Sequence, residues 1–67
     1  MSVLKVIEIL GDSSEGWEAA AEEAVTVAAK TVKNIRSVWI KDHSAMVKGG
    51  EIVSYRVTCK ITFEVDN

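Results

Sequence analysis

The chain is short and slightly acidic, with 67 residues, a net charge of −2, one cysteine and one histidine. One cysteine excludes an internal disulfide, one cysteine with one histidine excludes a Cys/His zinc cluster, and the charge gives no support to nucleic-acid binding. Such a small chain forms one domain with a small core, so we expect a single domain over residues 1–67 that is stabilised by self-association.

The first predicted element is a strand over Val3–Leu10, a run rich in aliphatic and β-branched residues that Gly11 is predicted to end. This run is too short to span a membrane, and it contains Lys5 and Glu8. We see no signal or transit peptide. Because the lone Cys59 also suits a reducing compartment, we expect a cytoplasmic protein.

A helix is predicted next, over Ser14–Lys33. Asp12 and Glu15 have the spacing of a capping box, and Asn34 is a residue that tolerates the left-handed geometry found at helix ends. The apolar residues recur at spacings of three and four, which predicts that one stripe of the helix packs on the sheet. This stripe consists of Trp17, Ala21, Ala24, Ala28, then Val32 or Thr31, and Ile35.

The rest of the chain is typical of a β-hairpin, with an extended run over Ile35–Lys48 and a turn at Gly49-Gly50. The returning strand alternates apolar and polar residues without a fault over Val53–Asp66. We predict a register without shifts, because a slip of one residue would mix the two faces. The predicted pairs include Lys48–Glu51, Met46–Val53, Ser44–Tyr55, His43–Arg56, Asp42–Val57, Ile40–Cys59, Trp39–Lys60 and Arg36–Phe63.

Strand, helix, strand and strand in this order predict an α+β fold of β-α-β-β topology, with one three-stranded antiparallel sheet packed on one helix. The apolar side of the last strand is expected to face the helix. Cys59 lies on that side, so we interpret it as a small buried hydrophobe rather than a reactive thiol. The other face of the sheet needs partners from outside the monomer.

Catalytic groups are nearly absent from the sequence. The register gives His43 no serine or cysteine nucleophile, and Ser44 is expected to point to the opposite face. We therefore interpret His43 as a surface or interface side chain rather than a general base, and we expect a protein that is not an enzyme.

Trp39 is the unusual residue, because it is expected on the polar face of the hairpin. Its indole could lie at an oligomer interface, stack on Lys60 as a cation–π pair, or form a wall for a planar ligand. In the last case Ser37, Arg56 and Lys60 would supply hydrogen-bond donors beside the ring. The residues alone leave these three interpretations open.

Four segments together resemble the dodecin family, whose members bind flavins and assemble as hollow homododecamers. They are V-I-E-I-L-G-D-S-S-E at 6–15, A-A-A-E-E-A at 19–24, T-V-K-N-I at 31–35 and Y-R-V-T-C-K-I-T-F-E-V at 55–65. The resemblance runs from about Lys5 to Asp66. It implies one dodecin-like domain, a sheet wrapped around the helix, and a twelve-subunit shell that stores or sequesters a small ligand such as FMN.

The ligand positions of the family differ in this chain. Ser37 stands where flavin-binding dodecins have the stacking tryptophan, and Arg56 where they have a glutamine. Trp39 is two residues further along, which displaces its side chain by roughly 6.6 Å. We expect Ser37, Trp39, Arg56 and Lys60 to line the corresponding pocket, where Arg56 would favour a phosphate or nucleotide group.

The alternative is a flavin-free, dodecin-like shell that is structural or holds a metal ion. The candidate oxygen donors for such an ion are Asp42, Glu64 and Asp66. Their spacing does not single out a metal. A membrane or nucleic-acid partner is not expected under either interpretation.

Overall fold

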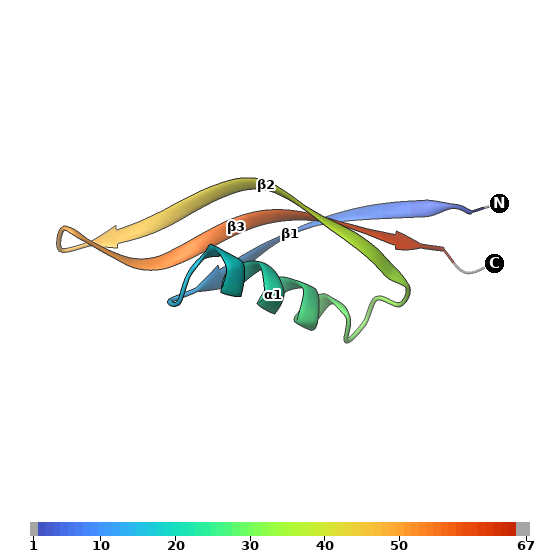
Figure 1. Ribbon diagram of the computed structural model, residues 1–67, viewed down its shortest axis with the longest axis horizontal. Helices are drawn as coiled ribbons and strands as arrows, with labels where there is room; N and C mark the ends of the chain where they lie inside the picture. Colours follow the sequence, from blue (N-terminus) through green and yellow to red (C-terminus); the bar gives the residue numbers. More distant parts are fainter. Residues whose placement is uncertain (1, 66–67) are drawn as a thin grey trace.

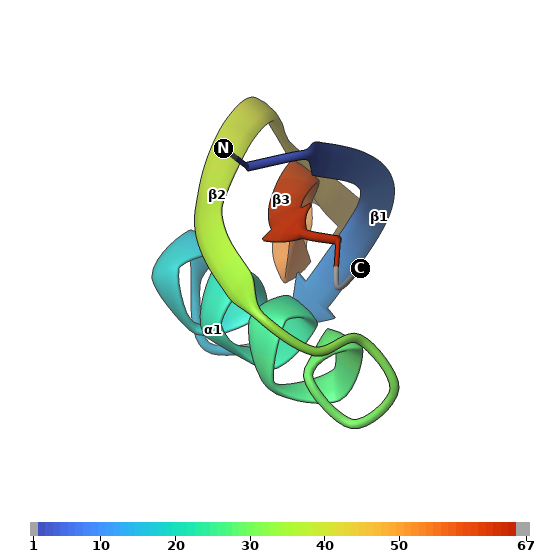
Figure 2. The ribbon, with the colours of Figure 1, turned by 90° about the vertical axis from the view of Figure 1, so that its right-hand side faces the viewer.

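The computed structural model describes residues 2–65. Its elements are β1 (Leu4–Ser13), α1 (Trp17–Ala28), β2 (Ile35–Lys48) and β3 (Glu51–Glu64). The strands form one antiparallel sheet in the order β1-β3-β2, with α1 against one face (Figure 1). Figure 2 shows that the two outer strands curve on either side of β3, above the helix. The predicted β-α-β-β fold is therefore confirmed.

The core is small because the helix contributes only alanines to it. Ala20, Ala24 and Ala28 are buried, as are Val57, Cys59 and Ile61 of β3. Ala20 and Ala24 pack against Val57 and Cys59 in one cluster. No polar side chain is buried among the described residues. Burial raises the pKa of the Cys59 thiol, which fits its predicted role as a buried hydrophobe. The helix stripe differs slightly from the prediction, since Ala20 is fully buried and Ala21 only partly.

The sequence predicted that Gly11 ends the first strand, but β1 continues to Ser13. Its role is to let the helix approach. A Cβ atom at Gly11 would overlap the backbone carbonyl of Ala20 and press on the side chain of Ala24. The missing side chain is therefore what allows α1 to lie directly on β1 at this point.

The helix is shorter than predicted, and it starts without the expected capping box. Gly16 precedes it with a φ of 153°, and no side chain caps the first turn. Asp12 does not cap the helix, because it lies within β1, four residues before Gly16, and its carboxylate accepts hydrogen bonds from Arg56. The Ser13 hydroxyl accepts a hydrogen bond from the Glu15 amide at 3.0 Å, which holds the turn before the helix.

A tight turn ends the helix before Lys33, the predicted last residue. The carbonyl of Ala28 accepts hydrogen bonds from the amides of both Thr31 and Val32. Asn34 then adopts a φ of 64°, as its left-handed tolerance predicted. Its carbonyl accepts a hydrogen bond from the Glu64 amide at 3.0 Å, which leads the chain into β2.

The hairpin register follows the prediction beside the turn and over residues 37–40, but it differs between these two stretches and again at Ile35. Lys48 pairs with Glu51, and Trp39 pairs with Lys60, as expected. Val53 is an extra residue in β3 and Lys41 an extra residue in β2, so the pairs between them are shifted by one. The corrected pairs are Met46–Ser54, Ala45–Tyr55, Ser44–Arg56, His43–Val57 and Asp42–Thr58, and a third irregularity pairs Ile35 rather than Arg36 with Phe63.

This shift moves His43 to the helix side of the sheet. Its ring makes an edge contact with Trp17, with centroids 5.7 Å apart, and Trp17 also contacts Tyr55 at 5.0 Å. The indole Nε1 of Trp17 donates a hydrogen bond to the Ser44 carbonyl at 2.9 Å. These contacts hold the start of α1 against the turn end of the β2–β3 hairpin, which we call the hairpin arm. The arm extends past the helix, and the longest dimension of the molecule is 51 Å (Figure 1).

The last predicted strand, Val53–Asp66, corresponds to β3, which begins earlier, at Glu51. Its predicted alternation is confirmed for the residues opposite the helix, where Val57, Cys59 and Ile61 are buried in turn. The predicted end at Asp66 lies outside the described residues.

Candidate functional site

The four predicted ligand residues all lie on the face of the sheet that the helix does not cover, which we call the open face. Trp39 is 62% exposed there and pairs across the strands with Lys60. The Lys60 ammonium lies 5.4 Å from the centre of the indole ring, so the predicted cation–π contact forms within one chain. Ser37, two residues before Trp39, pairs with Thr62 on the same face. The structure thus brings Ser37, Trp39 and Lys60 together.

Arg56 lies on the open face as well, but it is directed elsewhere. It is four residues from Lys60 along β3, a distance of about 13 Å in an extended strand. Its Nη2 and Nε both donate to one carboxylate oxygen of Asp12 on β1, at 2.9 and 3.2 Å. The guanidinium is therefore already paired with an anion, and it points toward β1 rather than toward Trp39.

The candidate metal ligands do not form a site within one chain. Asp42 is exposed on the open face opposite Thr58, and Glu64 is paired with Arg36 at 2.8 Å. Hydrogen bonds from Arg36 and Ser2 hold the pKa of Glu64 below its ordinary value, with a smaller effect from the Arg36 charge. Asp66 lies outside the described residues. Among residues 2–65 no group of three or more His, Cys, Asp or Glu side chains could hold a metal ion.

The structure also shows open-face residues that the sequence reasoning missed. Leu4, Val6 and Leu10 of β1 project there and are between 54% and 62% exposed. Glu8 lies between them and forms an ion pair with Lys41 of β2 at 3.8 Å. The signal was present in the sequence, because the first strand is apolar at both odd and even positions, as expected for a strand that is covered on both faces.

No helix within residues 2–65 has the length and apolar character needed to cross a membrane. His43 has no catalytic arrangement around it in the described part of the chain, since its ring contacts Trp17 and lies opposite Val57. The open face therefore offers an exposed indole, paired charges and apolar strand residues, which together suit binding rather than catalysis.

Comparison with known proteins shows which family has this sequence and fold. A family model described as Dodecin matches residues 3–66. The calcium dodecin of Mycobacterium tuberculosis is 37% identical over 65 residues, which are 97% of this chain and 92% of the relative. The dodecin of Thermus thermophilus is 28% identical over 64 residues, which are 96% of this chain and 93% of the relative.

Solved structures give the same picture. The dodecin from Streptomyces davaonensis has a TM-score of 0.95 at 26% identity, covering 98% of this chain and 97% of that one. The crystal structure of the Mycobacterium tuberculosis calcium dodecin, which is described as having a novel calcium-binding site, has a TM-score of 0.84 at 38% identity. That match covers 97% of this chain and 93% of the other.

Proposed function

The chain belongs to the dodecin family of non-enzymatic binding proteins, and from this premise we propose that it forms a shell that binds calcium between copies of itself. Homododecamers are characteristic of the family, and we expect the same assembly here. In this proposal the shell binds a cation rather than a flavin, and its role is to store or sequester that cation. A cytoplasmic location stays a prediction.

The observation that carries this proposal is the state of the two family ligand positions. Ser37 has no ring on which a flavin could stack, and the side chain of Arg56 is engaged by Asp12. The exposed ring of Trp39 lies two residues away and carries Lys60 over it. A planar ligand would have to displace that ammonium to reach this side of the indole.

The identities of the relatives also support calcium rather than a flavin as the ligand. The protein named for calcium is 37% identical to this chain, and the Thermus thermophilus dodecin is 28% identical. Calcium takes six to eight oxygen ligands, often carboxylates and carbonyls, and one described chain does not gather that many acidic groups. Donors from more than one copy are therefore part of the proposal.

Asp42 is the carboxylate best placed to contribute. It lies on β2, an edge strand of the sheet, and it forms no ion pair with the other described residues. Glu8, Asp12 and Glu64 are each held by a lysine or arginine. An unpaired carboxylate at a sheet edge can meet its equivalent in a neighbouring copy, where a divalent cation would offset the repulsion between them.

The test is calcium binding by the assembled protein after treatment with a chelator, measured by calorimetry beside a titration with FMN. We expect calcium to bind, and Asp42→Asn to weaken it by roughly tenfold or more. Glu22→Gln, a change at an exposed helix position, is the matched control and should leave calcium affinity unchanged. Stoichiometric FMN with no calcium binding would contradict the proposal.

A flavin-type planar ligand is the second candidate, and the exposed indole of Trp39 favours it. Ligands of this class would quench the fluorescence of Trp39 on stacking, and Trp39→Phe would remove that quenching while Trp17→Phe would not. A yellow preparation with an absorbance band from bound flavin would support this candidate directly.

A further inference from the structure

We propose that Asp12 is a positioning residue for the calcium site: its carboxylate holds the Arg56 guanidinium against β1, and this leaves Asp42 able to bind the cation. The inference rests on the proposed function and deepens it, because it identifies what keeps a cationic neighbour away from the proposed calcium ligand. It concerns contacts within one chain.

The side chains of the open face are arranged in rows across the sheet. The two ladders place residues side by side on β1, β3 and β2, and we call each such set of three a row. In one row an arginine lies between an acidic residue and a serine, and in the next row the acidic residue is on β2. The first row consists of Asp12, Arg56 and Ser44, and the next row consists of Leu10, Thr58 and Asp42.

Arg56 therefore has two carboxylates beside it. Asp12 is directly opposite on β1, and Asp42 is the diagonal neighbour on β2. Diagonal neighbours of a sheet are about 7–8 Å apart, which a long side chain can span. The shift in the hairpin register creates this choice, because the predicted register placed Asp42 opposite Val57 on the helix side.

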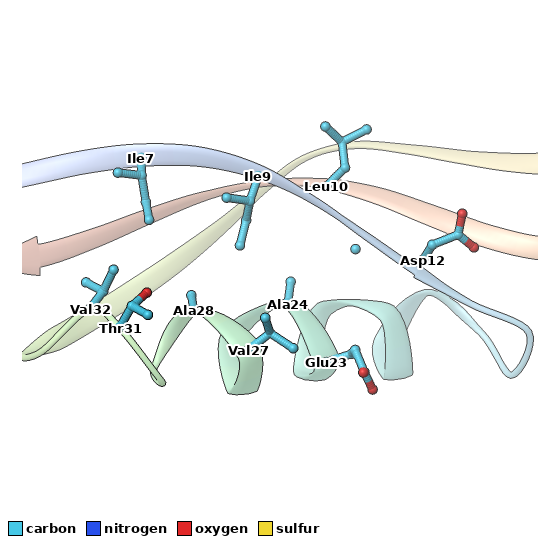
Figure 3. A pocket seen from close by; sticks show the side chains of 11 residues that line it. Ile7, Ile9, Leu10, Asp12, Glu23, Ala24, Val27, Ala28, Thr31 and Val32 are labelled. Carbon is cyan, nitrogen blue, oxygen red and sulfur yellow. The ribbon is translucent and has the colours of Figure 1, made fainter.

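The structure shows which of the two carboxylates holds the guanidinium. The Nη2 and Nε groups of Arg56 donate to Oδ2 of Asp12 at 2.9 and 3.2 Å. Figure 3 shows the side chain of Asp12 directed away from α1, and the groove between β1 and α1 lies on the other side of the strand. Within residues 2–65 Asp42 forms no ion pair. The arginine thus neutralises one carboxylate and leaves the other charged.

The consequence of this pair lies in position rather than in stability. The side chains of Arg56 and Asp12 are 40% and 43% exposed, and exposed ion pairs contribute little to the free energy of unfolding. Two hydrogen bonds to one oxygen nevertheless fix where the guanidinium points. Without the charge of Asp12, the carboxylate left within reach of Arg56 would be Asp42. An arginine paired there would compete with calcium for the same oxygens.

Lys60 provides a comparison within the same strand. It lies two residues after Thr58 on β3, as Arg56 lies two residues before it, so both basic residues are one row from Asp42. The Lys60 ammonium lies 5.4 Å from the centre of the Trp39 ring. Each basic residue of β3 beside Asp42 is therefore held by another group.

The first test is calcium binding by the assembled protein after treatment with a chelator, measured by calorimetry at one salt concentration. Asp12→Asn should weaken calcium binding by roughly tenfold, because Arg56 then pairs with Asp42. Asp12→Glu, the conservative variant, keeps a carboxylate opposite Arg56 and should preserve the affinity. Unchanged affinity in Asp12→Asn, while the wild type binds calcium, would overturn this inference and leave the proposed function intact. No calcium binding by the wild type would overturn the proposed function, and with it the site that Asp12 serves.

Two double variants of equal net charge separate position from charge. Adding Arg56→Gln to Asp12→Asn removes the arginine that would pair with Asp42, so calcium affinity should return to the wild-type level. Adding Lys60→Gln to Asp12→Asn restores the same net charge one row from Asp42, and the affinity should stay low. Equal recovery in both double variants would show an effect of net charge alone and would overturn the inference.

A third measurement does not need calcium. The NMR resonance of the Arg56 Nε–H group responds to the group that accepts its hydrogen bond. In the Asp12→Asn background, adding Asp42→Asn should shift this resonance, whereas Asp42→Asn alone should leave it in place. An unchanged resonance in both backgrounds would overturn the positioning role, whichever ligand the shell holds.

Discussion

The two faces of the sheet use the same strands for different purposes. On the helix side, Val57, Cys59 and Ile61 are at most 1% exposed, and the contacts are apolar. On the open face the neighbouring residues of β3 alternate with them and carry hydroxyl, ammonium and guanidinium groups. Period-two alternation thus lets one strand supply both the core and the surface for partners, which a chain of 67 residues needs.

The largest expected effect comes from shortening a buried side chain on the helix side of the sheet. Ile61 is fully buried, so Ile61→Ala should lower the free energy of unfolding by about 3 kcal/mol through lost apolar contact and a cavity. Thr62→Ala is the matched change on the open face, and we expect its effect to stay within about 0.5 kcal/mol. Chemical denaturation of both variants checks this, and equal losses would contradict the division between the faces.

A smaller effect is expected where the helix side is tied to the arm. Trp17→Phe keeps a ring against His43 and Tyr55 but removes the hydrogen bond from the indole to the Ser44 carbonyl. We expect a loss of about 1 kcal/mol in the free energy of unfolding. In this variant the amide hydrogen exchange of residues 42–46 should increase more than that of residues at the base of the hairpin. Unchanged exchange in the arm would show that the bond does not anchor it.

The smallest effect belongs to the open face and depends on pH. Because Arg36 lowers the pKa of Glu64, the ionised carboxylate is favoured in the folded state. This contribution is present above the unfolded pKa of a glutamate, and it is lost as pH falls through the lower, folded value. Arg36→Gln should raise the pKa of Glu64 in an NMR titration. Lys41→Gln, which removes a different ion pair, should leave that titration unchanged.

The order of the elements could be predicted because hydrophobic periodicity and the Gly49-Gly50 turn are local signals. The register could not be predicted between Asp42 and Met46, because no residue type marks the extra residues at Val53 and Lys41. For this reason His43 was expected on the wrong face. Residues 37–40 keep the predicted register, and the contact of Trp39 with Lys60 was therefore predictable.

The ion pair of Arg56 with Asp12 escaped prediction for a different reason. It joins strands that are far apart in the sequence, and the first strand was expected to end before Asp12. In the structure β1 extends to Ser13, which places Asp12 opposite Arg56 in the sheet. Local patterns therefore predicted the contact of Trp39 with Lys60 on the open face, but not the pair of Arg56 with Asp12.

The irregularities at Val53 and at Lys41 offset the hairpin in opposite directions, so the strands return to their original phase beyond them. The stretch from Asp42 to Met46 is therefore turned over relative to residues 37–40, while the separate irregularity at Arg36 shifts the pairing of Ile35. This gives the fold a modular property: paired insertions at those two points can invert what one short segment displays while both ends of the sheet stay untouched.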